Sequence, residues 1–259
     1  EIGVRLVGSE MCIRDSVTAA DHGAKVLLFE KMDKVGLKMG ITGKGRCNLT
    51  NNAPIMDFIA MTPGNGRFLF SAYKRFNNMD LLSLFHTWGL ETKVERGGRI
   101  FPASDDAQEV RHLFMRLLHE KQVDVHLSEP VLHIQTKKGC AAGVATGKGT
   151  YEADAVILAT GGKSYPRTGS TGDGYRLAGE LGHTVTKIRP ALIPLVCAEP
   201  YCRELQGLSL KNVTLALAAG GRRKSEAFGE MIFTHFGISG PIVLTPVSYT
   251  HLTLPTKLE

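Results

Sequence analysis

Apolar residues occur along this chain in short runs separated by glycine-rich and polar segments. One apolar run, residues 24–30, ends in Glu30 and follows a segment, 17–23, that is typical of a helix ending at glycine. This order predicts the second half of a β-α-β unit. Apolar spacing also predicts helices over 68–76 and 79–88, and residues 91–101 predict a hairpin.

A long amphipathic helix is predicted after Ser104, which precedes two acidic residues and is placed to cap it. Its apolar stripe has the spacing i, i+3, i+4, i+7 and i+8 that favours burial against a core: Val110, Leu113, Phe114, Leu117 and Leu118. Further on, four strands are predicted, over 123–127, 131–136, 141–146 and 155–159. The first three are expected to form an antiparallel meander that leads into the last, which is expected to be buried. A glycine-rich loop, 169–174, then opens a helix that runs through Leu181.

Domain boundaries are predicted where the pattern changes. From Pro190 onward the segments are β-rich with few helical signals, which indicates a first domain over 17–190 and the start of a second over 191–245. The two ends, 1–16 and 246–259, resemble peptides that arise when a sequencing adaptor is translated. We expect both ends to be non-native and not to pack as parts of the fold, although residues 5–16 can take a strand-helix shape because the strand over 24–30 leaves a neighbouring position empty.

Composition narrows the classes of protein that remain. The 259 residues are 43% hydrophobic with a formal net charge of +6, which fits a globular protein with an anionic small ligand as well as it fits nucleic acid. No apolar run approaches the ~18 residues of a membrane helix. Five cysteines without a CxxC pair indicate reduced thiols and a cytoplasmic protein, and nine histidines without an HxxxH or HExxH pattern predict no metal site.

Two features of the first domain suggest nucleotide chemistry. Glu30 stands where the carboxylate at a strand end accepts the hydroxyls of an adenosine ribose, although the usual GxGxxG partner is absent and Gly8 stands alone. Residues 40–51, GITGKGRCNLTN, combine glycines for close backbone approach with Lys44, Arg46 and Asn48 for an anion. They do not form a P-loop, because Gly45 follows Lys44. A basic surface loop stays open as the alternative.

Several long motifs together resemble one protein family. Besides residues 30–51, these are GRIFP at 98–102, ATGGKSYPRTGSTGDG at 159–174 and GEMIFTHFGISGP at 229–241. They are similar, in order, to motifs of the bacterial NAD(P)/FAD-dependent oxidoreductases of the aminoacetone-oxidase or BaiN type. The resemblance covers residues 17–245, and ATGG and TGDG are also similar to elements of fumarate-reductase-type flavoproteins.

The resemblance implies an α/β fold, with a Rossmann-like two-dinucleotide-binding FAD domain that contains a β-meander and with a β-rich substrate domain inserted into it. It implies FAD as cofactor and transfer of hydride from NAD(P)H through the flavin to a small-molecule substrate. By the same resemblance the cofactor-binding residues are Glu30, Lys31, Thr42, Gly43, Gly45, Arg46, Cys47, Asn48, Val131, Thr160, Gly161 and Gly162.

Candidates for catalysis come from the same segments. Arg46 is the candidate for stabilising negative charge on the reduced flavin, because its loop combines a fixed cation with glycine access. Further candidates are Cys47 as a redox thiol and Tyr165 and His235 as proton donors.

Two other hypotheses about the function of the chain stay open. It is an inactive fragment unable to bind FAD if the missing glycine motif and the missing returning segment of the FAD domain are essential. It is a basic nucleic-acid-binding module if the cations of residues 31–46 bind a strand, but no aromatic residues alternate with them. We therefore expect no nucleic acid partner and no membrane association.

Overall fold

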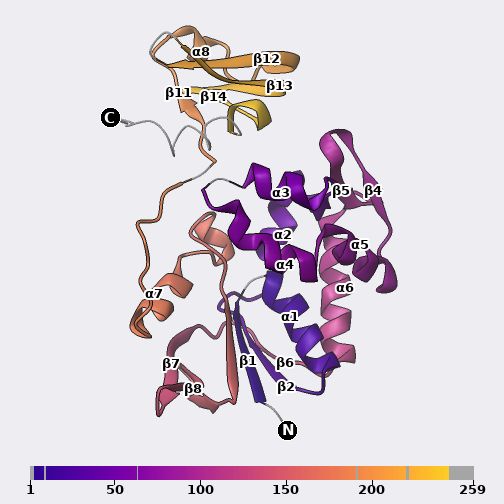
Figure 1. The fold of residues 1–259 in the computed structure, drawn as a ribbon, viewed down its shortest axis with the longest axis vertical. Helices are drawn as coiled ribbons and strands as arrows, with labels where there is room; N and C mark the ends of the chain where they lie inside the picture. Colours follow the sequence, from indigo (N-terminus) through magenta and orange to yellow (C-terminus); the bar gives the residue numbers. More distant parts are fainter. Residues whose placement is uncertain (1–2, 9, 63, 191, 220–221, 245–259) are drawn as a thin grey trace. The chain divides into compact units, whose positions relative to one another are not determined.

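The structure is a computed structural model that describes residues 3–8, 10–62, 64–190, 192–219 and 222–244. Its contacts divide the chain into two compact units (Figure 1). The first unit comprises Glu1–Ile55 and Ala72–Thr186, and the second comprises Met56–Ser71 and Lys187–Glu259. In the described part of the chain, no helix is long and apolar enough to cross a membrane.

A parallel sheet of four strands lies at the centre of the first unit, in the order β10-β1-β2-β6. Its strands are β1 (Gly3–Gly8), β2 (Lys25–Phe29), β6 (Asp124–His126) and β10 (Ala155–Ala159). Leu28 and Phe29 of β2 are fully buried, as the apolar run before Glu30 predicts. Parallel pairing with helical crossovers is the Rossmann-like α/β arrangement, and this confirms the expected fold class.

Two long helices of the first unit, α1 (Glu10–Asp21) and α6 (Ala107–Glu120), contact each other and share a core with β1 and β2. All five residues of the stripe predicted for α6 are buried. The capping residue is Asp106 rather than Ser104, because the Asp106 carboxylate accepts the N–H of Gln108 at 2.8 Å. Ser104 instead hydrogen-bonds the Glu109 side chain.

A second sheet forms the predicted meander, with antiparallel strands β7 (Val131–Lys137), β8 (Cys140–Thr146) and β9 (Thr150–Glu152). It shares a buried cluster with β2 that includes Phe29, Val131 and Val144. The strand expected over 123–127 is not part of this meander, because β6 pairs in parallel with β2. The strand expected to be buried, β10, is partly exposed, because β1 is its one partner in the sheet order.

Shorter elements complete the first unit. The predicted hairpin is present and forms a small sheet with β3, and its turn is a 3-10 helix containing Gly97 and Gly98. A helix of five residues, α2, interrupts the segment 36–52, which has no helical pattern because so short a helix completes hardly more than one turn. These elements are α2 (Leu37–Ile41), η1 (Thr42–Lys44), β3 (Thr50–Asn51), α5 (Asn78–Thr87), β4 (Thr92–Val94), η3 (Arg96–Gly98), β5 (Arg99–Pro102), η4 (Pro166–Thr168) and α7 (Asp173–Glu180).

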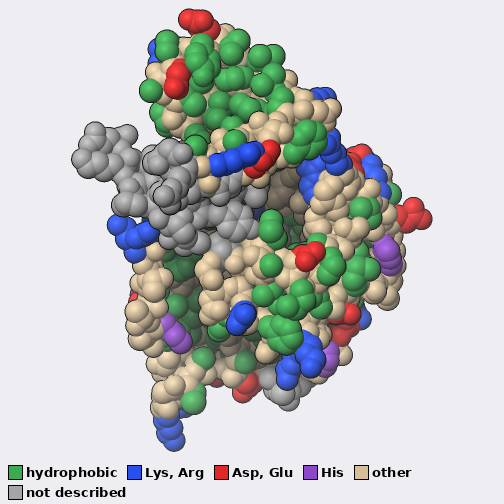
Figure 2. Space-filling model, turned by 45° about the horizontal axis from the view of Figure 1, so that its top comes forward, with side chains coloured by type: hydrophobic (Ala, Val, Ile, Leu, Met, Phe, Trp, Pro, Cys, Tyr) green, Lys and Arg blue, Asp and Glu red, His purple; other side chains and the backbone are tan. Residues whose placement is uncertain are grey.

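The second unit is built mainly on an antiparallel sheet with the order β11-β14-β13-β12, and its β-rich pattern was expected from Pro190 onward. Its buried cluster includes Met231, Ile242 and Val243. Figure 2 shows many apolar side chains on its visible surface, and Phe228 is 60% exposed. Its strands and helix α8 are β11 (Leu195–Val196), α8 (Tyr201–Glu204), β12 (Ser209–Ala219), β13 (Arg222–Thr234) and β14 (Gly237–Ser239). Helix α3 (Ile55–Met61) and η2 (Gly66–Leu69) precede α4 (Phe70–Arg75), which crosses the division between the units.

Among the described residues of segment 1–16, the expected strand-helix shape is present, whereas the expectation that this segment does not pack as part of the fold is wrong. Strand β1 lies between β10 and β2, and Cys12 and Ile13 of α1 are buried. The physical reason is that β2 and β10 leave room for one parallel strand, whose backbone pairs independently of sequence, while apolar residues of α1 fill the core. Whether this segment is native stays a prediction, and residues 246–259 lie outside the described residues.

Replacing Ile13 by alanine tests this packing. Ile13 is fully buried, so Ile13→Ala should lower the free energy of unfolding by about 2–5 kcal/mol through lost burial and a cavity. Urea unfolding followed by circular dichroism measures the change. The control is Met115→Ala on α6, whose side chain is 42% exposed and whose loss should be much smaller. Equal effects of the two variants would mean that residues 1–16 are not packed.

Candidate functional site

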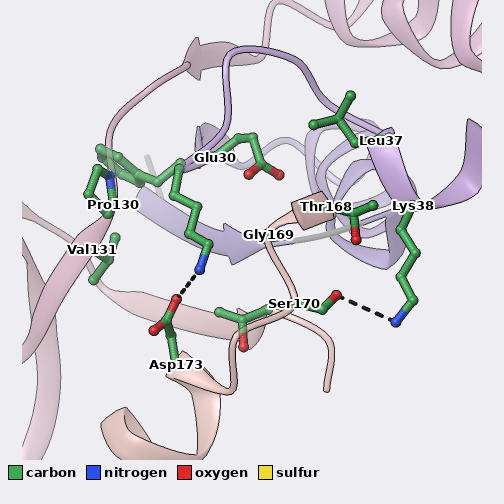
Figure 3. A pocket seen from close by; sticks show the side chains of 13 residues that line it. Glu30, Leu37, Lys38, Pro130, Val131, Thr168, Gly169, Ser170 and Asp173 are labelled. Atoms are coloured by element: carbon green, nitrogen blue, oxygen red, sulfur yellow. Dashed lines mark hydrogen bonds and ion pairs between the residues drawn. The ribbon is translucent and has the colours of Figure 1, made fainter. Parts of the chain in front are cut away.

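A pocket lies at the carboxyl ends of the parallel strands (Figure 3). Glu30 directly follows β2, Thr160 directly follows β10, and Val131 begins β7 after the chain leaves β6. Ligands of open α/β sheets bind outside this edge. The pocket is lined by Phe29, Glu30, Lys31, Gly36, Leu37, Lys38, Pro130, Val131, Thr160, Thr168, Gly169, Ser170 and Asp173.

Glu30 is held in a fixed place. Its Oε1 accepts the N–H of Met32 at 2.9 Å, and its own N–H donates to the carbonyl of His126 at 2.9 Å. Its carbonyl accepts the N–H of Glu129 at 3.0 Å. Glu30 was expected at a strand end outside the core, but it is only 7% exposed. A buried, fixed carboxylate at this edge suits the recognition of hydroxyl groups.

Two lysines connect the walls of the pocket. Lys31 Nζ lies 2.7 Å from Asp173 and also hydrogen-bonds Thr171. Lys38 Nζ donates to the Ser164 hydroxyl at 2.9 Å and to the Ser170 hydroxyl at 3.4 Å, as Figure 3 shows for Ser170. Burial by itself would raise the pKa of Asp173, but the hydrogen bond and charge of Lys31 outweigh it, so this pKa lies below its usual value. The pocket therefore holds positive charge beside hydroxyl donors.

Glu129 adjoins the pocket without lining it, and its carboxylate is almost fully buried. Oε1 accepts the hydroxyls of Thr146 at 2.7 Å and Tyr151 at 2.8 Å. Oε2 lies 3.1 Å from His126 Nδ1 and 3.0 Å from Lys148 Nζ. Burial acts to raise the pKa of Glu129, but these four partners together lower it to about 2.

The loop of residues 40–51 faces a second, more apolar pocket. Thr42, Cys47 and Asn48 line it, and Lys38 lines both pockets. Its other lining residues are Arg14, Met39, Leu49, Phe76, Leu81, Phe85 and Phe114. The residues predicted to bind the cofactor are thus divided between two neighbouring pockets: Glu30, Lys31, Val131 and Thr160 line the first, and Thr42, Cys47 and Asn48 the second.

The predicted glycines shape the backbone. Gly43 has a φ of 57°, and a Cβ there would lie 2.7 Å from the Phe101 ring, so no other residue fits without movement. Gly161, which directly follows Thr160, has a φ of 72°. Gly45 ends η1, and Gly162 follows Gly161. None of these four glycines is among the residues that line the two pockets.

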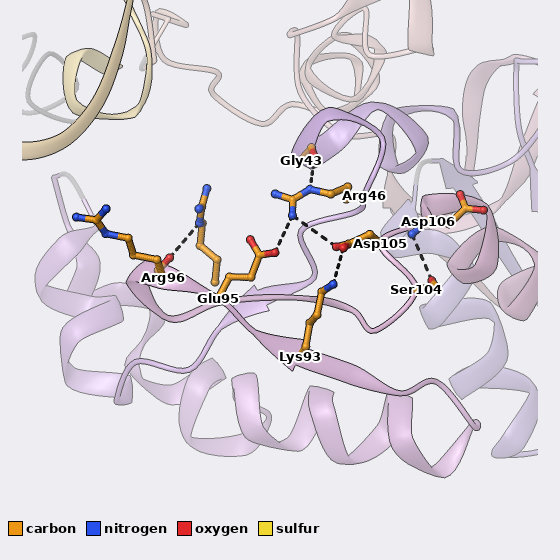
Figure 4. Close-up of polar contacts among 9 residues, drawn as sticks. Gly43, Arg46, Lys93, Glu95, Arg96, Ser104, Asp105 and Asp106 are labelled. Carbon is orange, nitrogen blue, oxygen red and sulfur yellow. Dashed lines mark hydrogen bonds and ion pairs between the residues drawn. The ribbon is translucent and has the colours of Figure 1, made fainter. Parts of the chain in front are cut away.

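Arg46 lines neither pocket and is engaged elsewhere (Figure 4). Its Nη1 lies 2.7 Å from Glu95 and 3.5 Å from Asp105, and its guanidinium stacks on the Phe101 ring at 4.2 Å. Lys93 also pairs with Asp105, and its hydrogen bond is the main cause that lowers the pKa of Asp105. Arg46 therefore ties the loop to the β4–β5 hairpin, and its role toward a flavin stays a prediction.

The other catalytic candidates belong to different elements of the structure. Cys47 is buried at the second pocket, whereas Tyr165 is 65% exposed just before η4. His235 belongs to the second unit, where its ring contacts Phe236. Within the described residues, no group of three metal-ligating side chains forms a metal site.

Sequence reasoning missed several residues at or beside the first pocket, and those with charged or hydroxyl side chains include Lys38, Ser170, Asp173 and Glu129. The signal for the first three is present in the sequence, because Lys38 lies two residues before the GITGKGRCN motif begins and Ser170 and Asp173 lie within GSTGDG. Nothing local marks Glu129, whose partners on the meander lie 17 to 22 residues further along the chain.

These features define an α/β protein with a Rossmann-like parallel sheet, and comparison with known proteins agrees with this class. Residues 11–247 match the family described as the HI0933-like protein Rossmann domain. The chain belongs to this family of FAD-dependent Rossmann proteins. The resemblance to BaiN-type oxidoreductases is thereby confirmed.

Two curated relatives extend over most of the chain. It is 35% identical over 224 residues to the 3-dehydro-bile acid delta(4,6)-reductase of Clostridium scindens, covering 85% of this chain and 53% of the relative. It is 30% identical over 240 residues to the ribosomal RNA dihydrouridine synthase of Escherichia coli K12, covering 90% of this chain and 57% of the relative. The chain thus spans somewhat more than half the length of these relatives.

Solved structures share the fold. The open conformation of a flavocytochrome c3 fumarate reductase matches with a TM-score of 0.51 at 18% identity, over 82% of this chain and 47% of that one. The Mycobacterium smegmatis Sdh1 complex in the apo form matches with a TM-score of 0.51 at 17% identity, over 70% and 39%. At such identities the likeness shows the fold alone.

The residues present fit one end of FAD better than the middle. The adenosine end fits, because Glu30 supplies a fixed carboxylate and Val131 lines the same pocket. A diphosphate needs glycines at the first strand-to-helix turn, and the sequence there has Gly8 but no GxGxxG motif.

The Glu129 network predicts a specific acid sensitivity. Because its pKa falls from the usual 4.5 to about 2 in the folded state, Glu129 stabilises the fold fully above about pH 4.5, and this contribution is lost as the pH falls toward 2. The shift corresponds to about 3 kcal/mol. In Glu129→Gln, the free energy of unfolding should be lower at pH 7 and should fall less between pH 5 and 3.

Urea unfolding at fixed pH values measures this dependence. The matched control is Glu152→Gln, which removes an exposed carboxylate from the neighbouring strand β9 and should leave the pH dependence as it is. Parallel curves for Glu129→Gln and the parent chain would show that Glu129 is not ionised and bound as described.

Proposed function

We propose that this chain is the cofactor-binding part of an FAD-dependent oxidoreductase that takes electrons from NAD(P)H. The observation that carries the proposal is the buried Glu30 carboxylate, fixed at the carboxyl end of β2 in one pocket with Val131 and Thr160. Membership of an FAD-dependent family supports it. The cytoplasm is the compartment we propose.

The roles of the protein's own residues follow from their places. FAD, when bound, supplies hydride transfer between a donor and a substrate. Glu30 would accept the ribose hydroxyls, the backbone at Val131 would face the adenine, and Thr160 to Gly162 would lie beside the diphosphate. The loop from Thr42 to Asn48 would hold the remainder of the cofactor.

The names of the relatives suggest a reaction class. A 3-dehydro-bile acid delta(4,6)-reductase acts on carbon–carbon double bonds conjugated to a 3-oxo group, and a dihydrouridine synthase makes a nucleoside whose ring double bond beside a carbonyl is saturated. We infer that the substrate here is an unsaturated carbonyl compound whose carbon–carbon double bond is reduced. The two electrons and one hydrogen come from NAD(P)H as hydride, and the second hydrogen comes as a proton.

The size of the substrate distinguishes two candidates. A small molecule is the first, as the sequence predicts. An RNA uridine is the second, because relatives from Escherichia coli and Haemophilus influenzae are named ribosomal RNA dihydrouridine synthases. The prediction of no nucleic acid partner therefore stays untested, and both substrates belong in the assay.

Flavin binding and reduction test the proposed function. A version of the protein in which a segment with GxGxxG replaces residues 1–16, and which extends to the length of its relatives, should purify with absorbance near 450 nm. NADH or NADPH should bleach this absorbance without oxygen. A conjugated steroid dienone and uridine-containing ribosomal RNA are then offered to the reduced protein. A colourless protein, even after addition of FAD, would rule out the proposal.

Glu30 provides the residue-level test in the same protein. Glu30→Ala should weaken FAD binding at least ~10-fold, because charge-assisted hydrogen bonds to the ribose each contribute about 1.5–3 kcal/mol. Glu30→Gln should lose less, since an amide oxygen still accepts one hydrogen bond and the N–H of Met32 keeps its acceptor. Calorimetric titration measures the affinities. Parent-like binding by Glu30→Ala would place the ribose elsewhere and remove the assignments built on Glu30.

A further inference from the structure

The segment that carries Glu129 is joined to the segment that carries Glu30 by backbone hydrogen bonds. The N–H of Glu30 donates to the carbonyl of His126 at 2.9 Å, and the N–H of Glu129 donates to the carbonyl of Glu30 at 3.0 Å. Beyond these, the N–H of Ser128 donates to the carbonyl of Met32 at 2.9 Å. Two stretches about 100 residues apart in the sequence thus keep one fixed spacing beside the pocket.

The Glu129 side chain fixes this segment on its other side, to the meander. Thr146 ends β8, Lys148 lies in the β8–β9 turn and Tyr151 lies in β9, and all three contact the Glu129 carboxylate. The Tyr151 ring also packs edge-on against Phe29 with centroids 4.9 Å apart. One carboxylate therefore joins the end of β6, the meander and the ring packed on β2.

The two residues that directly follow Glu129, Pro130 and Val131, form one wall of the nucleotide pocket. We propose that Glu129 is a positioning residue for this pocket, which holds the Pro130–Val131 backbone at the spacing from Glu30 that an adenosine nucleotide requires. The proposal rests on the proposed function for the kind of ligand. Burying a carboxylate costs free energy that burying an apolar residue would not cost. In return, the buried Glu129 carboxylate fixes the position of the Pro130–Val131 backbone.

Binding of ADP to the full chain tests the proposal, because ADP carries the adenosine that the wall would face. ADP binding is measured by titration calorimetry at pH 7, at a temperature at which every variant is more than about 95% folded. Glu129→Ala should bind ADP about tenfold more weakly than the parent chain, and Glu129→Gln about threefold, since the amide keeps an acceptor for Thr146 and Tyr151. Tyr151→Phe, which keeps the ring, should bind about two- to threefold more weakly.

The matched control separates positioning from stability. Val110→Ala removes buried volume from α6 in the other core cluster and should lower stability without changing ADP affinity. If Glu129→Ala binds ADP as Val110→Ala does, Glu129 has only a structural role and the proposal is overturned.

Absence of ADP binding to the parent chain would count against the proposed nucleotide site, not against Glu129. Amide hydrogen exchange then decides. Exchange at Ser128 and Glu129, relative to exchange in β1, which carries neither substitution, should become at least about tenfold faster in Glu129→Gln and stay unchanged in Val110→Ala. Unchanged relative exchange in Glu129→Gln would overturn the proposal without reference to any ligand.

Discussion

The pairing of β1 with strands on both sides is the interaction on which the candidate site depends. Glu30 follows β2 and Thr160 follows β10, and these strands are neighbours only through β1. The register places Val7 opposite Phe29 and Gly8 opposite Ala159, so the ends of all three strands meet at one edge. Because parallel ladders are made by backbone groups, a segment of unusual sequence can form this strand provided that it extends and carries apolar residues.

Buried charge is the second constraint on the site. Glu30 and Glu129 are both carboxylates removed from water, and each is retained through donors that come from other segments of the first unit or from its own turn. The two lysines differ from these carboxylates, because the side chains of Lys31 and Lys38 are held at the pocket by Asp173 and by the Ser164 hydroxyl. The pocket thus combines acceptors of fixed position with cations on flexible side chains, which is the mixture that a ribose beside a phosphate calls for.

The elements that could be predicted are those whose pattern is local. The apolar stripe of α6 repeats over three turns, and the apolar run of β2 ends directly before Glu30. Both elements could therefore be predicted from residue spacing alone. Helix α2 is too short for a repeat, and Ser104 and Asp106 carry equally good capping groups, so only geometry separates them. For residues 1–16, the empty place beside the 24–30 strand predicts a strand followed by a helix, but resemblance to a non-native peptide says nothing about whether the segment packs.

Site residues whose partners are distant in sequence were beyond prediction. The charge of Arg46 suggested an anion, but the structure provides carboxylates 49 and 59 residues away, at Glu95 and Asp105. Glu129 was overlooked for the opposite reason. A single acidic residue before a proline, in a connection between strands, has nothing near it in the sequence that indicates a functional role. In both cases the missing information is which segments the sheet brings together.

The two halves of the nucleotide site are built by separate parts of the chain. The proposed adenosine half depends on β2 and the start of β7, whereas the proposed diphosphate half depends on the turn before α1 and on Thr160 after β10. The glycines of a GxGxxG motif let backbone N–H groups approach a diphosphate, and the sequence where β1 leads into α1 has only Gly8 of them. Pairing of β1 with β2 and β10 uses backbone groups and does not require those glycines. The fold of this strand-turn-helix segment and its recognition of a diphosphate therefore depend on different features of its sequence.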